Sequence, residues 1–135
     1  MKQVTAAIAI QDGKVFLARR APDQALAGRW EFPGGKIEEG ETPGQCLRRE
    51  LWEEFNVDDD VKHFVIEGVY EYESGPIQLL AYAVEFGGGE FCLRVHDKIA
   101  WAGLDQLLDY DLLPADVPVA QWVMQRNVDR VELDS

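Results

Sequence analysis

The segment from Gly35 to Val57 constrains this chain most, because a glycine-rich loop is followed by acidic residues at helical spacing. Residues three and four apart lie on one side of a helix, so Glu50, Glu53 and Glu54 would share one face. Three carboxylates placed this way repel each other unless a cation lies between them. Ligands that are all oxygen atoms favour Mg²⁺ or Mn²⁺. The segment therefore predicts a helix that binds a divalent metal.

Local signals give the bounds of this helix. Thr42 is a favoured N-cap residue, and Pro43 suits the first helical position because its missing N–H leaves no bond unmade. Leucines recur at a spacing of four on a face that can be buried. Asn56 tolerates the left-handed conformation that commonly ends a helix. We expect the helix to run from Pro43 to Phe55.

These residues resemble the signature of the Nudix hydrolase family. That signature is Gly, five residues, Glu, seven residues, Arg-Glu, an aliphatic residue, any residue, Glu-Glu, any residue, Gly and an aliphatic residue. The matching positions here are Gly35, Glu41, Arg49, Glu50, Leu51, Glu53, Glu54, Asn56 and Val57. The one departure is Asn56, which replaces a glycine, and asparagine also tolerates a positive φ.

Further segments are similar to those of MutT-like enzymes and the related CTP pyrophosphohydrolases, namely 19–21, 31–37, 40–43 and 113–116. The resemblance implies an α+β fold, a Nudix-type α/β/α sandwich with a mixed central sheet, in one domain over residues 1–135. It also implies metal-dependent hydrolysis of a nucleoside triphosphate, normal or modified, to a monophosphate and pyrophosphate. CTP, dCTP and 8-oxo-dGTP are the substrates that this similarity favours.

The resemblance also assigns roles within the signature. It implies that the metal, Mg²⁺ or Mn²⁺, is bound by Gly35, Glu50, Glu53 and Glu54. Clustered carboxylates with a divalent ion polarise phosphorus and deprotonate a water molecule. Glu50, Glu53 and Arg49 are the catalytic residues that the resemblance implies, with Glu50 helping to activate water and Arg49 orienting a glutamate. We expect Glu41 to be a structural partner of Arg49.

Four residues outside the acidic helix are expected to bind substrate: Arg20, Phe32, Lys36 and Asp116. By resemblance, Arg20 contacts the nucleotide, Phe32 packs near the base and Lys36 reaches phosphate. Two alternatives stay open. Arg20 is also compatible with a surface arginine at the end of a strand, and Phe32 with an ordinary core residue.

Asp116 departs from the MutT enzymes that select 8-oxoguanine, which carry asparagine at the matching position. An ionised aspartate only accepts hydrogen bonds, which suits an exocyclic amine such as cytosine N4 or guanine N2. We therefore do not expect strict selectivity for oxidised guanine. The alternative is that Asp116 caps the final helix.

A second departure concerns a metal-binding glutamate that MutT-like enzymes often carry six residues before the tryptophan that matches Trp101. Val95 occupies that position here. Asp97 is the expected replacement, because it lies close enough in sequence to reach the same metal or water. We interpret His96 as a loop histidine.

The remaining pattern predicts strands at Val4–Ile10, Lys14–Arg20, Val61–Tyr72, Ile77–Phe86, Glu90–Leu93 and Ile99–Trp101. The first two form a hairpin, and the third and fourth pair antiparallel. A short helix is expected at 103–108 and a final helix at Val119–Val128, with Trp122 in the core. Residues 58–60 are expected to form a solvated acidic turn.

Composition limits the possible partners. The 135 residues are 47% hydrophobic, which is enough for one domain with a core. A net charge of −12 disfavours nucleic acid, whose binding depends on Lys and Arg, and an acidic protein that handles phosphates needs a metal. The apolar run at Val4–Ile10 is too short for export or a membrane span, so we expect no membrane partner and a cytoplasmic location.

Cys46 and Cys92 match neither a zinc motif nor a disulfide framework, so both are expected to be buried reduced thiols.

The sequence leaves open whether the protein is a monomer or a homodimer, and whether it serves nucleotide pool sanitation or pyrimidine turnover. Two other functions also stay open. One is a Nudix hydrolase of nucleotide sugars or dinucleoside polyphosphates, and the other is a non-catalytic nucleotide sensor on the same scaffold.

Overall fold

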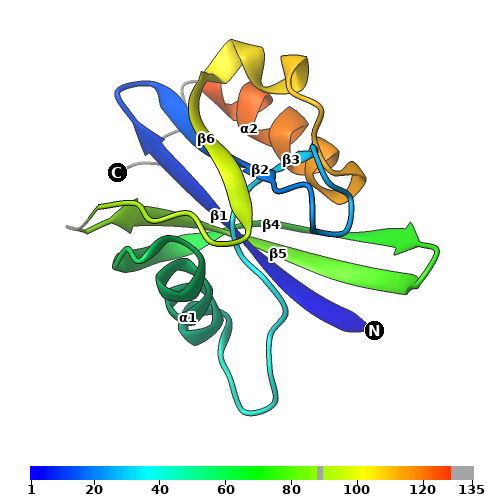
Figure 1. Ribbon diagram of the computed structural model, residues 1–135. Coiled ribbons are helices and arrows are strands. Elements are labelled where there is room, and N and C mark those ends of the chain that lie inside the picture. The colour runs from blue at the N-terminus through cyan, green and yellow to red at the C-terminus, as the bar shows by residue number, and fades with distance from the viewer. Residues whose placement is uncertain (88–89, 129–135) are drawn as a thin grey trace.

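A computed structural model describes residues 1–87 and 90–128, and Figure 1 shows its strands between two helices that lie on opposite sides. The strands are β1 (Lys2–Gln11), β2 (Lys14–Arg20), β3 (Trp30–Glu31), β4 (Asp59–Tyr72), β5 (Gly75–Phe86) and β6 (His96–Gly103). Their order is β3-β2-β1-β5-β4, and β6 pairs with β2. β1 runs parallel to β5, whereas the other paired strands are antiparallel. The expected mixed sheet is confirmed.

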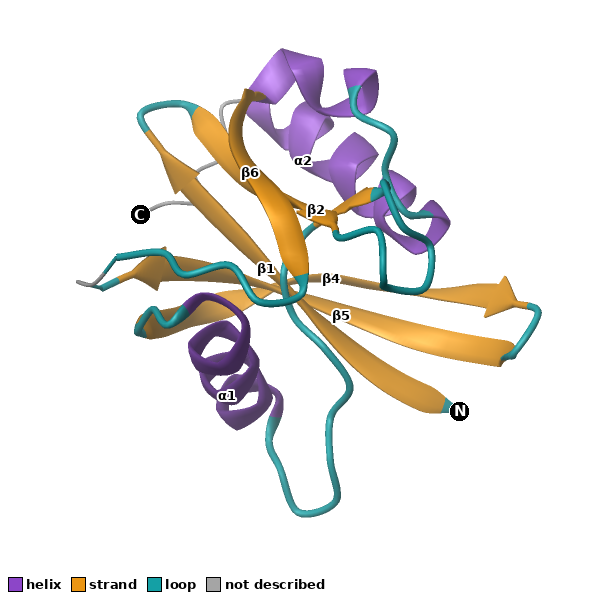
Figure 2. Cartoon of the chain, viewed as in Figure 1, coloured by secondary structure: helices purple, strands orange, loops and turns teal. Residues whose placement is uncertain are grey.

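β1 contributes to two hydrophobic cores, because successive side chains of a strand point to opposite faces of the sheet. Ala6 and Ile8 pack in the cluster that contains residues of α2 (Val117–Val128). Ala7 and Ala9 pack in the cluster that contains residues of α1 (Pro43–Phe55). Figure 2 shows the two helices on either side of the strands, so the α/β/α sandwich is confirmed.

The bounds of α1 are those that the sequence predicts. The Thr42 hydroxyl accepts a hydrogen bond from the Gln45 N–H at 3.1 Å, and the Gln45 side chain accepts one from the Thr42 N–H at 2.9 Å. This reciprocal pair is a capping box. At the other end, Asn56 adopts the left-handed conformation at φ 59°. The two leucines of the buried face are fully enclosed.

Both predicted hairpins are confirmed. In the first, Asp12 and Gly13 have φ values of 52° and 75°, which suit the tight turns of two-residue hairpins. In the second, β4 begins at Asp59 and is longer than expected. Asp59 is only 6% exposed, so the expectation of a solvated turn is wrong for this residue. Strand pairing with Phe86 draws it into the sheet.

The predicted edge strand at Glu90–Leu93 is wrong. Residues 90–93 form no strand, and the Cys92 N–H donates to the Phe55 carbonyl at 2.9 Å. This contact joins the segment to the end of α1 instead of to a sheet edge. Cys92 is exposed, so the prediction of a buried thiol is wrong here, although it is confirmed for Cys46.

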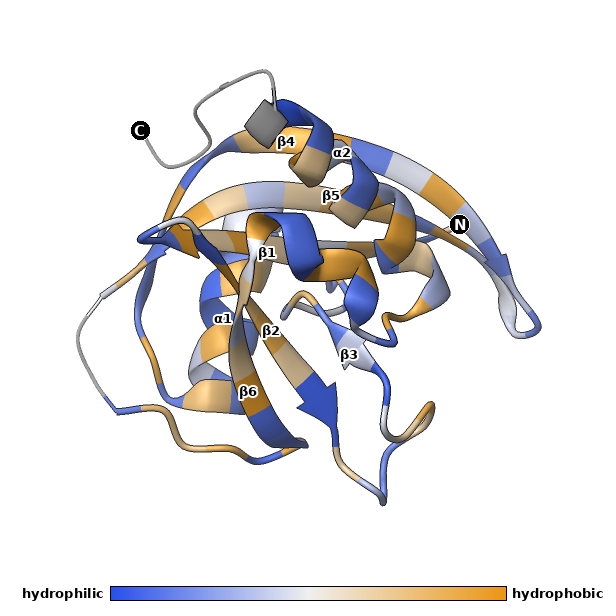
Figure 3. Ribbon diagram, turned by 90° about the horizontal axis from the view of Figure 1, so that it is seen from above, coloured by the Kyte–Doolittle hydropathy of each residue, from blue (hydrophilic) through white to orange (hydrophobic). Residues whose placement is uncertain are grey.

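The C-terminal part begins with β6, which is longer than the predicted strand. It is followed by 3₁₀ helices at Leu104–Asp109 and Pro114–Asp116, and by α2. Figure 3 shows that α2 carries both hydrophobic and hydrophilic residues along its turns. Trp122 is half-buried and packs at the edge of the core, with the Arg126 guanidinium 5.1 Å from its ring centre. No helix in the described residues is long and apolar enough to cross a membrane.

Candidate active site

The glycine loop between β3 and α1 brings the backbone close to the acidic helix. A Cβ on Gly34 would overlap the carbonyl oxygen of Thr5, so a side chain does not fit there. A Cβ on Gly35 would overlap the carboxyl group of Glu50. The absence of a side chain at Gly35 therefore leaves the space in which the Glu50 carboxylate lies. The Gly35 carbonyl accepts a hydrogen bond from the Thr5 N–H at 2.8 Å.

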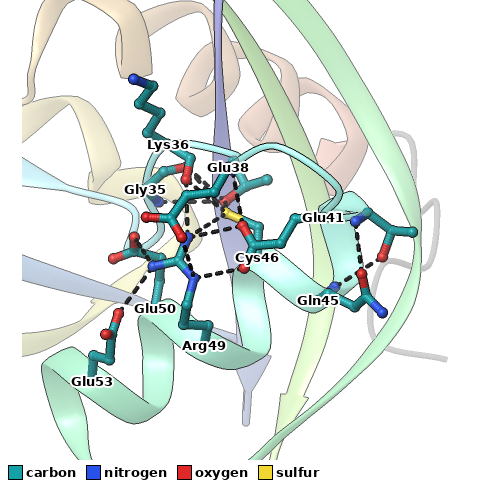
Figure 4. Close-up of polar contacts among 11 residues, drawn as sticks. Gly35, Lys36, Glu38, Glu41, Gln45, Cys46, Arg49, Glu50 and Glu53 are labelled. Atoms are coloured by element: carbon teal, nitrogen blue, oxygen red, sulfur yellow. Dashed lines mark hydrogen bonds and ion pairs between the residues drawn. The ribbon is translucent and has the colours of Figure 1, made fainter.

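Arg49 donates hydrogen bonds to three carboxylates, and we call Arg49, Glu41, Glu50 and Glu53 the arginine cluster (Figure 4). Its Nε and Nη2 donate to the two oxygens of Glu41 at 2.6 and 2.9 Å. Its Nη1 donates to Oε1 of Glu50 at 2.8 Å and to Oε1 of Glu53 at 3.0 Å. The expected pairing of Glu41 with Arg49 is confirmed. This pairing lowers the pKa of Glu41 to about 2.

Glu54 differs from Glu41, Glu50 and Glu53 because it accepts no hydrogen bond from Arg49. Its Oε1 atom is buried and has no hydrogen-bond partner among the described residues. Burial raises the pKa of Glu54 to about 9, and the negative charges of Glu31 and Glu50 raise it further. A buried carboxylate of this kind either carries a proton or lies beside a cation.

Glu31 lies on the other side of the loop and was not assigned a role from the sequence. Arg20 Nη1 lies 3.3 Å from both of its carboxylate oxygens, and His96 Nε2 lies 2.6 Å from Oε2. His96 is buried at the start of β6, where it pairs with Arg20, so its interpretation as a loop histidine is wrong. Glu31 and His96 are 65 positions apart, and no local pattern links them.

A pocket of about 640 Å³ opens beside the glycine loop. Arg20, Phe32 and Asp116, three of the four predicted substrate residues, line it together with Glu31. Phe32 also belongs to the hydrophobic core, so its interpretation as a core residue is confirmed, while packing near the base stays a prediction. The Lys36 side chain is exposed and points away from the Glu50 and Glu53 carboxylates in Figure 4, while its carbonyl accepts from Arg49. The structure therefore does not bring Lys36 into this pocket.

Asp116 is buried in the pocket, at 3% exposure. Its Oδ2 accepts a hydrogen bond from the Phe32 N–H at 3.0 Å, so the contact is with the pocket wall and not with a helix end. Burial raises the pKa of Asp116 well above its usual range, and the charge of Glu31 raises it further. Burial therefore shifts Asp116 toward its neutral form, whereas the sequence interpretation treats it as an ionised aspartate.

Asp97 is not supported as the replacement for the glutamate missing at Val95. Its two oxygens accept hydrogen bonds from Arg19 Nε and Nη2 at 2.8 and 2.9 Å. About a third of each side chain in this pair is exposed. The structure thus gives Asp97 a surface ion pair.

The acids of α1 fit a divalent metal by their chemistry. Carboxylate oxygens suit a hard cation, and the unpartnered oxygen of Glu54 is a donor that the fold leaves available. Among the described residues, no three Asp, Glu, His or Cys side chains already stand in a metal-binding arrangement. Arg49 contacts Oε1 of both Glu50 and Glu53, so a metal at these atoms would replace its hydrogen bonds.

Comparison with known proteins decides the family. The model of the NUDIX domain matches residues 1–123. The chain is a Nudix hydrolase. It is 37% identical to the CTP pyrophosphohydrolase of Escherichia coli K12 over 124 residues, which covers 92% of each chain. It is 38% identical to the 8-oxo-dGTP diphosphatase of the same organism, over 88% of this chain and 95% of that one.

Solved structures agree with this assignment. The solution structure of the E. coli ORF135 protein matches 96% of this Nudix hydrolase and 93% of that chain, with a TM-score of 0.86 and 37% identity. A MutT protein from Methanosarcina mazei Go1 shares the fold at a TM-score of 0.77 and 20% identity, over 97% and 96% of the two chains. The MutT-like resemblance and the expectation of an enzyme are confirmed, which disfavours the non-catalytic sensor.

Proposed function

We propose that this Nudix hydrolase cleaves a nucleoside triphosphate to the monophosphate and pyrophosphate, using Mg²⁺ or Mn²⁺. One observation carries the proposal. The pocket that contains Arg20, Phe32 and Asp116 also contains Gly35, whose open position accommodates the Glu50 carboxylate of the acidic helix. A nucleoside in this pocket would direct its phosphates toward α1. The named activities of the two E. coli relatives support the same substrate class.

We assign the acidic residues and Arg49 to two tasks, which are binding the metal and activating the attacking water molecule. Glu50, Glu53 and Glu54 would hold the metal with the Gly35 carbonyl nearby, and the bound metal would neutralise phosphate charge and polarise phosphorus. Arg49 aligns the Glu50 and Glu53 carboxylates through hydrogen bonds of 2.8 and 3.0 Å. Burial raises the pKa of Glu50, which makes it better suited to accept the proton of an attacking water molecule.

Asp116 bears on the choice of base. A neutral carboxyl group offers one O–H donor and a carbonyl acceptor, as an asparagine amide offers both kinds of group. Burial raises the pKa of Asp116 toward this neutral form, and a protonated Asp116 would pair with a base edge that asparagine would also recognise. It would then give no chemical reason to disfavour oxidised guanine, so CTP, dCTP and 8-oxo-dGTP all fit the proposal. Phe32 would pack on the base and Arg20 would contact the nucleotide. Lys36 would reach phosphate only after its exposed side chain turns toward α1.

We place this activity in the cytoplasm, with nucleotide as the only partner that the reaction requires and with a monomer or homodimer both compatible. Nucleic acid does not suit the net charge of −12, since phosphate backbones are bound mainly by Lys and Arg.

The test is product analysis with purified protein and Mg²⁺. CTP, dCTP, 8-oxo-dGTP and a nucleotide sugar are incubated separately, and phosphorus NMR identifies the products. We expect pyrophosphate and the monophosphate from a triphosphate, and a loss of about 100-fold in kcat for Glu53→Gln. Glu85→Gln, an exposed glutamate on β5, is the matched control and should keep its activity. Release of orthophosphate, or cleavage of the nucleotide sugar alone, would overturn the proposal.

A further inference from the structure

Three side chains connect the pocket to the C-terminal end of α1. Arg20 lines the pocket and pairs with Glu31 at 3.3 Å, and Glu31 is held by His96 at 2.6 Å. The His96 ring then stacks on Phe55, with 4.9 Å between ring centres and 14° between planes. Phe55 is the last residue of α1 and directly follows Glu54. We call Arg20, Glu31 and His96 the pocket relay.

Burial becomes more complete along the relay. The exposed fractions of the side chains are 22% for Arg20, 11% for Glu31 and 0% for His96. A carboxylate as buried as Glu31 is stable only while its partners hold it. The arginine approaches from the pocket side and the histidine from within the protein. Arg20 Nε also donates to the Ala25 carbonyl, so the guanidinium is held from two directions.

His96 is the part of the relay that substrate does not reach. It is absent from the residues that line the pocket, and its ring lies between Glu31 and Phe55. The other histidine of the chain, His63, lies exposed on β4. Of the two ring nitrogens of His96, only Nε2 has a hydrogen-bond partner among the described residues, and that partner is Glu31, which holds the pocket arginine; Nδ1 is buried without one.

We infer that His96 is a positioning residue of this hydrolase: it fixes Glu31, and Glu31 holds the Arg20 guanidinium in place for the nucleotide. The inference rests on the proposed function, because it requires that substrate meets Arg20. The stack on Phe55 adds a second effect, since it ties this arrangement to the helix that carries Glu54. The pocket and the metal-binding acids thereby keep a fixed spacing.

The relay has a kinetic signature that a purely structural role lacks. Arg20 contacts the nucleotide in the ground state and in the transition state alike, so misplacing it raises KM and leaves kcat nearly unchanged. A variant that is merely unstable loses active protein, which lowers apparent kcat and leaves KM unchanged. The ratio of the two effects separates the two explanations.

The test compares His96→Phe, His96→Gln and Glu31→Gln with His63→Gln as the matched control. Phenylalanine keeps the stack on Phe55 but has no donor for Glu31, so KM for CTP should rise about tenfold with kcat within about threefold. Glutamine supplies an N–H donor and should recover most of the wild-type KM. His63→Gln should match the wild type, and Mn²⁺ affinity should be unchanged in His96→Phe, which keeps both the stack on Phe55 and the charge of Glu31.

A double-mutant cycle completes the test. If His96 acts through Glu31, the effects of His96→Phe and Glu31→Gln on KM should not add. An unchanged KM in His96→Phe, or fully additive effects, would overturn the inference. If His96→Phe does not fold, Glu31→Gln and His96→Gln carry the same comparison.

Failure of the proposed function is distinguishable from failure of this inference. If the wild type hydrolyses no triphosphate, calorimetric binding of CTP replaces turnover as the readout. CTP affinity must then fall in His96→Phe and recover in His96→Gln, and equal affinity in all variants would overturn the inference.

Discussion

In the arginine cluster, one guanidinium donates to three carboxylates, whereas the inner acids, Glu31, Glu54 and Asp116, share no common donor among the described residues. Glu31 has Arg20 and His96, Asp116 has one backbone N–H, and Oε1 of Glu54 has none. The acids of both sets are carboxyl groups of one candidate active site, so they differ only in their surroundings.

The difference shows which charges the protein neutralises by itself. Pairing with Arg49 lowers the pKa of Glu41 to about 2, whereas burial raises the pKa of Glu54 to about 9. Arg49 and Glu41 therefore form a stabilising pair within the arginine cluster. Glu54 is a destabilising residue that a cation would relieve, which is a common property of functional sites.

Of the variants that test this difference, Glu54→Gln is expected to change activity most. Activity should fall at least about 100-fold, because a metal-facing carboxylate is lost. The melting temperature of the metal-free variant should be equal to or above that of the wild type, because the amide removes a buried carboxylate that lacks a partner at Oε1. Turnover and thermal unfolding in EDTA measure both. Retained activity would contradict the assignment of Glu54 as a metal-binding acid. A clear loss of stability in the metal-free variant would contradict the claim that Glu54 destabilises the protein without metal.

Arg49→Met should have the opposite effect on stability. It removes the common donor of Glu41, Glu50 and Glu53, so the free energy of unfolding should fall by about 1 to 3 kcal/mol. Urea unfolding in EDTA measures the change. Arg48→Met is the matched control, because Arg48 is the preceding residue of α1 and is exposed, and its change should stay below about 0.5 kcal/mol. Equal losses in the two variants would show that the cluster contributes no special stability.

Asp59 shows the effect of burial on a carboxylate that has no expected role in metal binding. It is buried on β4, and both of its oxygens lack hydrogen-bond partners among the described residues. Burial raises its pKa from 3.8 to about 6. A carboxyl pKa that is raised in the folded state destabilises the protein as pH rises from 3.8 to 6, and the full penalty remains above that range. Asp59→Asn should therefore raise stability by about 1 kcal/mol at pH 7 and by little at pH 4.

Urea unfolding at the two pH values gives the result, and Asp58→Asn, an exposed neighbour, is the control. Activity of Asp59→Asn should stay at the wild-type level. An equal gain at both pH values would mean that Asp59 is already paired or protonated.

The smallest effect is expected for Asp116→Asn. Because burial raises the pKa of Asp116 and so shifts it toward the neutral acid, an amide of similar shape should change kcat/KM for CTP by less than about threefold at pH 7. Asp116→Leu, which removes both polar groups, should lower kcat/KM by about 10-fold or more. Kinetics with CTP and 8-oxo-dGTP provide the comparison. If Asp116→Asn is as damaging as Asp116→Leu, the carboxylate acts in its ionised form.

The sequence predicts the arginine cluster far better than the inner acids. Every residue of the cluster lies within one signature, and Thr42, Pro43 and Asn56 fix the bounds of its helix through local chemistry. The two hairpins are equally local. Glu31 and His96 meet only because β6 pairs with β2, and strand pairing over that distance leaves no local trace.

Burial explains most of the remaining differences. Asp59 was expected in a solvated turn, Asp116 was expected to be ionised and His96 was expected in a loop, yet all three are buried. A sequence pattern identifies the residue type, but the protonation state depends on solvent exclusion by distant segments. The error at Glu90–Leu93 has a related cause, because the end of α1 supplies its hydrogen-bond partner.

The most direct measurement is a calorimetric titration of the metal-free protein with Mn²⁺, in the wild type, Glu54→Gln and Glu85→Gln. The wild type and Glu85→Gln should bind Mn²⁺ saturably and gain melting temperature with it, and Glu54→Gln should bind at least about tenfold more weakly. Equal Mn²⁺ affinity in all three proteins would contradict the claim that the acids of α1, including the buried Glu54, are there to hold a divalent ion.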